Sequence, residues 1–177
     1  MNEDIPDQDL KTQARHAFTL ILAKLGRRDH TEKELLTALG RKGYAEEAAR
    51  EAVARARREG LVDDERLAAS LARMNARSGK RGPRRVVASL RQKGIAGATA
   101  AEVTKEAFAG SEEAEASLLR FATRLLGRAK GETPREKRIR VVRSLLGRGF
   151  ELREARRVVS LAENALINEN RRDDADE

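Results

Sequence analysis

The sequence predicts an all-α protein of three tandem three-helix repeats, and two observations support this fold class. Apolar residues recur at helical spacing along most of the chain, and no stretch alternates with the period of a strand. A short phrase also occurs three times, its first leucines 51 and 55 residues apart: Leu39-Gly40-Arg41-Lys42-Gly43-Tyr44, Leu90-Arg91-Gln92-Lys93-Gly94-Ile95 and Leu145-Leu146-Gly147-Arg148-Gly149-Phe150. A period of this length is typical of a small structural unit that is repeated.

The repeated phrase has the composition of a helix end. Its leucine suits a core position, a cation stands near the negative end of the helix dipole, and glycine permits the left-handed conformation that stops a helix. The residue after each glycine is apolar and can fold back onto the helix. We therefore expect a structural role for the three glycines, Gly43, Gly94 and Gly149.

The first repeat is expected at residues 13–61, after a disordered acidic N-terminus at residues 1–12. An apolar face predicts a first helix over residues 14–25. Thr31 and Glu34 form a predicted capping box for a second helix that runs to Lys42. A third helix is expected over residues 46–59.

The second repeat is expected at residues 62–110. Asp63 or Asp64 is placed to cap a helix whose predicted inward face is Leu67, Ala68, Leu71 and Met74. Pro83 suits the first position of a short middle helix, where no amide donor is needed, and its predicted inward face is Val86, Val87 and Leu90. The last helix of this repeat is expected near residues 99–109.

The third repeat is expected at residues 111–168, followed by a disordered tail at residues 169–177. Ser111 is placed to cap a long helix, and Thr133 precedes a proline at the start of the next. The predicted inward face of that second helix is Ile139, Val142, Leu145 and Leu146. The ninth helix is expected over residues 152–168.

The composition argues against several classes of protein. The chain has no cysteine, which excludes disulfides and thiolate chemistry, and no apolar run approaches the roughly 20 residues that span a bilayer. His30 and Glu34 share helical spacing, but no third metal ligand lies near them, and the Asp63-Asp64 pair is better placed to cap a helix. We expect a soluble, cytoplasmic protein that is not an enzyme and has no catalytic residue, metal site or cofactor.

Positive charge is the feature that points to a partner. Eight of the 29 acidic residues lie in the first ten and last five positions, so 37 Lys and Arg face 21 Asp and Glu in the rest of the chain. No acid occurs between Glu65 and Glu102, where nine cations do. The residues we expect to bind a polyanion or an acidic protein surface are Arg73, Arg77, Lys80, Arg81, Arg84 and Arg85, with Lys130, Arg135 and Arg138 at the equivalent place in the third repeat.

The stretch from Glu59 to Ile95 resembles the signature region of the RecX family. That family shows a Gly-Leu-aliphatic-Asp-Asp run, then Arg-aromatic-Ala, a basic loop with glycine, and a leucine before Lys-Gly-Ile. The residues in register are Gly60, Leu61, Asp63, Asp64, Arg66, Ala68, Gly82, Arg85, Leu90, Lys93, Gly94 and Ile95. Leu67 departs from the family's usual phenylalanine but is still apolar. Weaker similarity covers about residues 14–165.

The resemblance implies a non-catalytic regulator of RecA, active in homologous recombination, DNA repair and the SOS response. Family members resemble elongated, curved arrays of three units that lie in the groove of the RecA filament on single-stranded DNA. They inhibit filament extension, ATP hydrolysis, strand exchange and co-protease activity. For this chain the resemblance implies a monomer that binds the RecA filament and no membrane. Contact with single- or double-stranded DNA would be made through phosphates.

Two other functions remain open on the sequence. One is a DNA-binding protein of helix-turn-helix-like repeats that acts independently of RecA. A recognition helix should present Asn, Gln or Arg to base edges, and the predicted middle helices carry mostly Arg and Lys. The other is a helical-repeat adaptor for an acidic protein.

Overall fold

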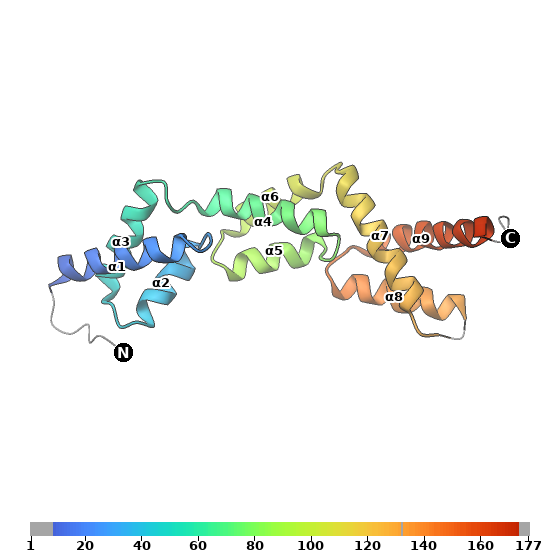
Figure 1. Cartoon of the computed structure of the whole chain (residues 1–177), viewed down its shortest axis with the longest axis horizontal. Helices are drawn as coiled ribbons and strands as arrows, with labels where there is room; N and C mark the ends of the chain where they lie inside the picture. Colours follow the sequence, from blue (N-terminus) through green and yellow to red (C-terminus); the bar gives the residue numbers. More distant parts are fainter. Residues whose placement is uncertain (1–8, 132, 174–177) are drawn as a thin grey trace. The chain divides into compact units, whose positions relative to one another are not determined.

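A computed structural model of the chain describes residues 9–131 and 133–173, and its side chains as far as residue 168 (Figure 1). Within these ranges the chain is all-helical and has no strand, as predicted. The helices are α1 (Leu10–Leu25), α2 (Glu32–Gly40), α3 (Glu46–Arg58), α4 (Asp64–Ser78), α5 (Pro83–Gln92), α6 (Gly97–Phe108), α7 (Glu112–Arg128), α8 (Pro134–Gly147) and α9 (Leu152–Asp173). None of them, as far as they are described, is long and apolar enough to cross a membrane.

The described residues fall into two compact units. The first reaches to Ala68 and includes Leu90–Thr99. In it α1 and α2 both pack against α3, and the core contains Ile21, Leu35 and Leu39 with a row of small residues on α3. Alanines on α3 let the two other helices approach it closely.

The second unit comprises Ala69–Ser89 and the chain from Ala100 on. Here α7 packs mainly along α9, and α8 packs against both. Their shared core contains the buried residues Leu118, Ala122, Leu145, Phe150, Val159 and Ala162.

The three copies of the repeated phrase adopt one backbone conformation. We refer to Leu39–Tyr44 as turn A, Leu90–Ile95 as turn B and Leu145–Phe150 as turn C. Their glycines have φ values of +86°, +99° and +89°. In each turn the amide after the glycine donates to the carbonyl of the first leucine, at 3.3, 3.1 and 3.2 Å, which is the bond of a Schellman helix stop.

Helix starts follow the predicted caps, with one correction at the N-terminus. The capping box of Thr31 and Glu34 is confirmed, and Ser111 and Thr133 both cap their helices. However, α1 begins at Leu10, because the Asp9 carboxylate accepts a hydrogen bond from the Thr12 amide at 2.9 Å. The predicted disorder over residues 1–12 is therefore wrong for residues 10–12, and residues 1–8 lie outside the described residues.

At the other end, α9 runs to Asp173, five residues beyond the predicted stop. Helix-forming residues such as Glu169 and Arg171 follow Asn168, and no glycine or proline interrupts them. The last four residues of the predicted tail, 174–177, lie outside the described part of the chain.

Two predicted inward faces are correct only in part, since Ala68 on α4 and Leu145 on α8 are buried as predicted but other members are not. On α4 the buried residues are Ala68, Ala72 and Ala76, while Met74 is 58% exposed. On α8 the buried residues are Val141 and Leu145, and the predicted Ile139 and Leu146 are exposed. In α4 the buried face consists of small residues four apart, which allow close packing. The larger apolar side chains beside this face led the sequence pattern to indicate a different one.

Candidate functional site

The basic loop between α4 and α5 is held by two glycines. A Cβ on Gly79, which has φ +62°, would lie 2.5 Å from the Ser117 carbonyl carbon, and one on Gly82 would lie 2.3 Å from that of Gly149. The Gly82 amide also donates to the Arg148 carbonyl at 2.8 Å. Only glycine permits such close approach of two backbones. The loop is thus anchored at both ends, with two cations between its anchors.

Three predicted cations of this region are exposed and unpaired. Arg73 lies on α4, and Lys80 and Arg81 lie between the anchor glycines. None of these three side chains forms an ion pair or a hydrogen bond with any other described residue. Unpaired guanidinium and ammonium groups on a fixed loop are suited to binding phosphate or carboxylate.

The other three predicted cations of this region already have partners. Arg77 pairs with Glu113 at 3.4 Å, and Arg84 pairs with Glu151 at 2.6 Å. The Arg85 guanidinium donates to the Gly147 carbonyl at 3.3 Å. The two ion pairs are exposed and therefore weak, so a strong anion could displace Glu113 or Glu151.

The cations predicted in the third repeat also divide into one that has a carboxylate partner and two that have no side-chain partner. Arg138 makes a two-pronged contact with Glu163, at 3.0 and 2.6 Å, and hydrogen bonding to that carboxylate raises the pKa of Arg138. Lys130 and Arg135 are exposed and have no side-chain partner among the described residues. Arg135 also borders a groove between α8 and α9 whose floor includes Ile139 and Val142.

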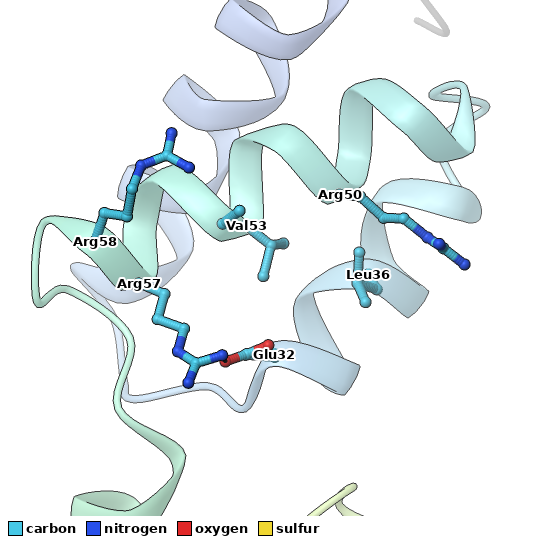
Figure 2. Close-up of a pocket in the computed structure, with 7 residues that line it drawn as sticks. Glu32, Leu36, Arg50, Val53, Arg57 and Arg58 are labelled. Carbon is cyan, nitrogen blue, oxygen red and sulfur yellow. The ribbon is translucent and has the colours of Figure 1, made fainter.

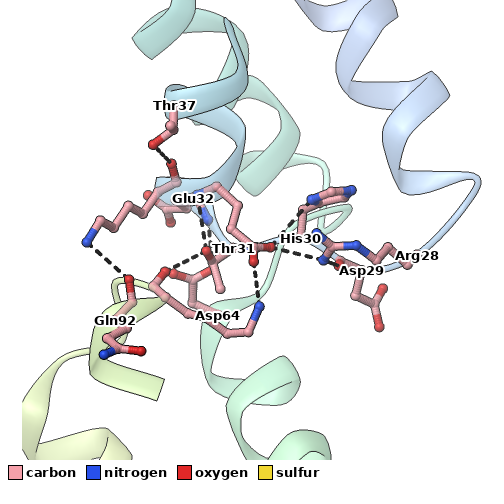
Figure 3. Close-up of polar contacts among 11 residues, drawn as sticks. Arg28, Asp29, His30, Thr31, Glu32, Thr37, Asp64 and Gln92 are labelled. Atoms are coloured by element: carbon pink, nitrogen blue, oxygen red, sulfur yellow. Dashed lines mark hydrogen bonds and ion pairs between the residues drawn. The ribbon is translucent and has the colours of Figure 1, made fainter. Parts of the chain in front are cut away.

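In the first unit, the N-terminal end of α2 is seated on turn B (Figure 3). The Thr31 hydroxyl donates to the Lys93 carbonyl at 2.6 Å, and the Lys33 ammonium donates to the Gln92 carbonyl at 3.1 Å. A Cβ on Gly94 would lie 2.6 Å from the Lys33 Cβ, so glycine is required for the fit. We call this contact the first joint.

Glu34 connects the first joint to the loop before α2. Its carboxylate pairs with Lys93 at 2.5 Å and with Arg28 at 3.1 Å, and His30 lies 3.4 Å away. Burial alone would raise the pKa of Glu34, but hydrogen bonds from Lys93 and Arg28 lower it to about 2. The pKa of His30 is lowered, chiefly by burial and then by Arg28. Among the described residues, no group of three potential ligands could hold a metal ion.

The two neighbouring aspartates have separate tasks. Asp63 caps α4 by accepting from the Arg66 amide at 2.9 Å. Asp64 instead accepts from the amide of Glu32, the first residue of α2, at 3.0 Å (Figure 3). Burial raises the pKa of Asp64, against the lowering effect of that hydrogen bond. The sequence placed both at a helix start but could not indicate that one reaches a helix 32 residues away.

The second unit contains an equivalent contact, the second joint. Here the start of α5 is seated on turn C: the Arg84 amide donates to the Gly149 carbonyl at 3.3 Å, besides the bonds of Gly82 and Arg85 described above. A Cβ on Gly149 would lie 2.6 Å from the Arg85 amide nitrogen. Sequence reasoning assigned Gly94 and Gly149 only to helix ends. It missed that both also receive a preceding helix.

A groove between α2 and α3 lies beside the first joint (Figure 2). Leu36 and Val53 form its apolar floor, and Arg50, Arg57 and Arg58 stand around it. Each of these arginines has a carboxylate partner, namely Glu46, Glu32 and Glu51 respectively. Their charges are already balanced, which sets this groove apart from the unpaired cations of the second unit.

Two family models match this chain: RecX, first three-helix domain, over residues 17–55, and RecX, second three-helix domain, over residues 63–103. Regulatory protein RecX of Pelodictyon phaeoclathratiforme is 31% identical over 147 residues, covering 82% of this chain and 88% of that protein. Regulatory protein RecX of Mycolicibacterium smegmatis is 29% identical over 177 residues, covering 96% and 92%.

Solved structures show the same fold. The crystal structure of RecX from Lactobacillus salivarius matches with a TM-score of 0.74 at 20% identity, covering 86% of this chain and 97% of that one. A second RecX crystal structure matches with a TM-score of 0.73 at 24% identity. The family models, the sequence relatives and the shared fold agree with the motif at Glu59–Ile95. The chain belongs to the RecX family of regulatory proteins.

Proposed function

We propose that this protein binds the RecA filament on single-stranded DNA and inhibits its extension, ATP hydrolysis, strand exchange and co-protease activity. Membership of a family of regulatory proteins supports a role in controlling another protein. The motif that resembles the RecA regulators covers α4, α5 and the basic loop between them. In this proposal the protein supplies no catalytic group and acts by binding alone.

The observation that carries the proposal is the set of unpaired cations Arg73, Lys80 and Arg81. They lie in a stretch of 36 residues without a single acid; Arg73 is on α4, and backbone contacts hold the loop of Lys80 and Arg81 at both ends. A protein filament on single-stranded DNA presents phosphates and carboxylates at regular intervals. Rigidly placed cations bind such groups with little loss of conformational freedom.

We also propose that the helices form three-helix repeats at residues 13–61, 62–110 and 111–168, with α1 extending the first repeat to Leu10. Turns A, B and C have matching backbone conformations at matching places in the chain, which supports this division. The two family models, each of a three-helix domain, fall within the first two proposed repeats.

The test compares two triple variants for binding to RecA filaments. The first reverses the unpaired cations (Arg73→Glu, Lys80→Glu, Arg81→Glu), and the control reverses three exposed arginines elsewhere in the second unit (Arg124→Glu, Arg153→Glu, Arg156→Glu). Both change the net charge by the same amount. We expect the first variant to bind at least about tenfold more weakly than the control, with circular dichroism unchanged for both.

Equal losses in the two variants would show that only net charge matters and would contradict the proposed site. The same proteins should be titrated against bare duplex DNA. If wild-type protein bound duplex tightly and ignored the filament, the DNA-binding alternative would replace this proposal.

A further inference from the structure

The two joints follow one rule. In each, the N-terminal end of a helix packs against a glycine turn that comes later in the chain. The carbonyls of the turn's cation and of the residue before it accept hydrogen bonds from that helix end. Turn B accepts from Thr31 and Lys33, and turn C accepts from Gly82 and Arg85. In each, residues of the helix start occupy the space that a Cβ on the turn's glycine would fill.

Turn A has the same form but no helix is seated on it. Gly43 has φ +86°, yet a Cβ built there would meet nothing within 4 Å. The carbonyls of Arg41 and Lys42 match the acceptors Gln92 and Lys93 in their place in the turn. Turn A thus has the backbone of a joint, with open space where a helix would pack.

The start of α8 is a donor that has no turn to occupy. Its residues Thr133, Arg135 and Glu136 match Thr31, Lys33 and Glu34 in type and in spacing. Thr133 accepts from the Glu136 amide at 3.2 Å, as Thr31 does from the Glu34 amide at 3.2 Å. The residues from Thr133 to Glu136 are all exposed.

We propose that turn A of one molecule receives the start of α8 from a second copy of this chain. By analogy with the first joint, the Thr133 hydroxyl would donate to the Lys42 carbonyl and Arg135 to the Arg41 carbonyl. The Lys42 ammonium would then pair with Glu136, as Lys93 pairs with Glu34. The contact is head-to-tail, so each added copy leaves one turn A and one α8 start open.

A second copy is the occupant because this chain carries both halves of the contact, namely turn A with open space beside Gly43 and the exposed Thr133 and Arg135 at the start of α8. The two internal joints supply the pattern of hydrogen bonds, and the charges of Lys42 and Glu136 are complementary. A contact of a few hydrogen bonds and one ion pair is weak. We therefore expect the dilute protein to be a monomer and to associate as its concentration rises.

The test uses a variant with a blocked turn and a variant with a blocked helix start. Gly43→Asn fills the open turn, and asparagine tolerates positive φ better than other side chains. Arg135→Glu removes the donor and repels the carbonyls. Gly110→Asn is the matched control for the first, since Gly110 also has φ +59° and open space, and Arg140→Glu is the control for the second.

The measurement is sedimentation velocity in low salt, without RecA or DNA, up to about 1 mM protein. Wild-type protein and both controls should show a sedimentation coefficient that rises with concentration. Each blocked variant alone should associate at least about tenfold more weakly. An equimolar mixture of the two should form dimers and nothing larger, because each supplies one intact half.

The proposal is overturned if the wild type stays monomeric over this range, if Gly43→Asn associates like Gly110→Asn, or if the mixture forms no dimer. Circular dichroism of every variant separates these outcomes from misfolding. Since the measurement contains no RecA, its result is independent of the proposed regulatory function.

Discussion

At the scale of single residues, hydrogen bonds lower the pKa of the Glu34 carboxylate to about 2 although its partial burial raises it. It accepts hydrogen bonds from Lys93 and Arg28 while only 22% of its side chain is exposed. These bonds tie the start of α2 both to turn B and to the loop that precedes it. The ionised carboxylate therefore strengthens the first joint, which the bonds of Thr31 and Lys33 also hold.

We expect Glu34→Gln to lower the free energy of unfolding by about 1–2 kcal/mol at pH 7. The pKa of Glu34 falls from 4.5 to about 2 on folding. Its contribution is therefore complete above pH 4.5 and is lost as the pH falls through 2. The difference between variant and wild type should shrink over that interval in urea unfolding curves. A difference that does not change with pH would contradict this assignment. The control is Glu102→Gln, on an exposed carboxylate that has no partner among the described residues.

A comparison of Thr31 with Thr133 separates the stability gained by capping a helix from the stability gained by the first joint. Both cap a helix through the same 3.2 Å bond, but only Thr31 is fully buried and also donates to the Lys93 carbonyl. We expect Thr133→Ala to cost about 1 kcal/mol and Thr31→Ala about 2–3 kcal/mol in thermal or urea unfolding. Equal costs would mean that the joint contributes nothing to stability.

At the scale of elements, turns A, B and C test whether a glycine serves only to stop a helix. All three have similar φ values, so replacement by alanine should cost each about 1–2 kcal/mol from backbone strain. Gly43→Ala should cost no more than this. Gly94→Ala should cost about 1–3 kcal/mol more, because its Cβ would collide with Lys33.

Gly149→Ala should cost about as much as Gly94→Ala, because its Cβ would lie 2.6 Å from the Arg85 amide nitrogen, and neither this atom nor the Lys33 Cβ moves when a side chain rotates. Urea unfolding of the three variants should therefore show turn A clearly less affected than turns B and C. Similar costs at all three turns would show that the joints adapt freely.

The turns and helix caps also show which features of the fold can be predicted from the sequence. The capping box at Thr31 and the Schellman turns depend on residues within six positions of one another, so local patterns identify them. The joints depend on contacts such as Thr31 with Lys93, 62 residues apart, and no local pattern encodes that pairing. Ala68 was correctly predicted to face inward, but Ala72 and Ala76 were missed because alanine carries little hydrophobic signal.

For the candidate site, the sequence located the cations but not their partners. An acid-free stretch is visible in the sequence, and it led to Arg73, Lys80 and Arg81. Pairing of Arg77 with Glu113 and of Arg84 with Glu151 arises from folding, which brings α7 and the start of α9 near the basic stretch. Only the structure separates the cations that are available to a partner from those already paired.

At the scale of the whole molecule, the net charge of +8 makes any contact with a polyanion dependent on salt. If the unpaired cations bind DNA phosphates in the filament, reversing Arg73, Lys80 and Arg81 should reduce the slope of log affinity against log salt by about 2–3. Fluorescence anisotropy of labelled filaments at several salt concentrations measures this. An unchanged slope with lower affinity would indicate contact with protein carboxylates instead.

We propose above that this protein regulates RecA through binding alone. The most direct measurement is the single-strand-dependent ATPase rate of RecA as this protein is titrated in from far below the RecA concentration. We expect hydrolysis to fall at substoichiometric amounts, and to fall much less with the variant reversed at Arg73, Lys80 and Arg81. An unchanged rate with the wild-type protein, together with salt-dependent binding to bare duplex DNA, would contradict it.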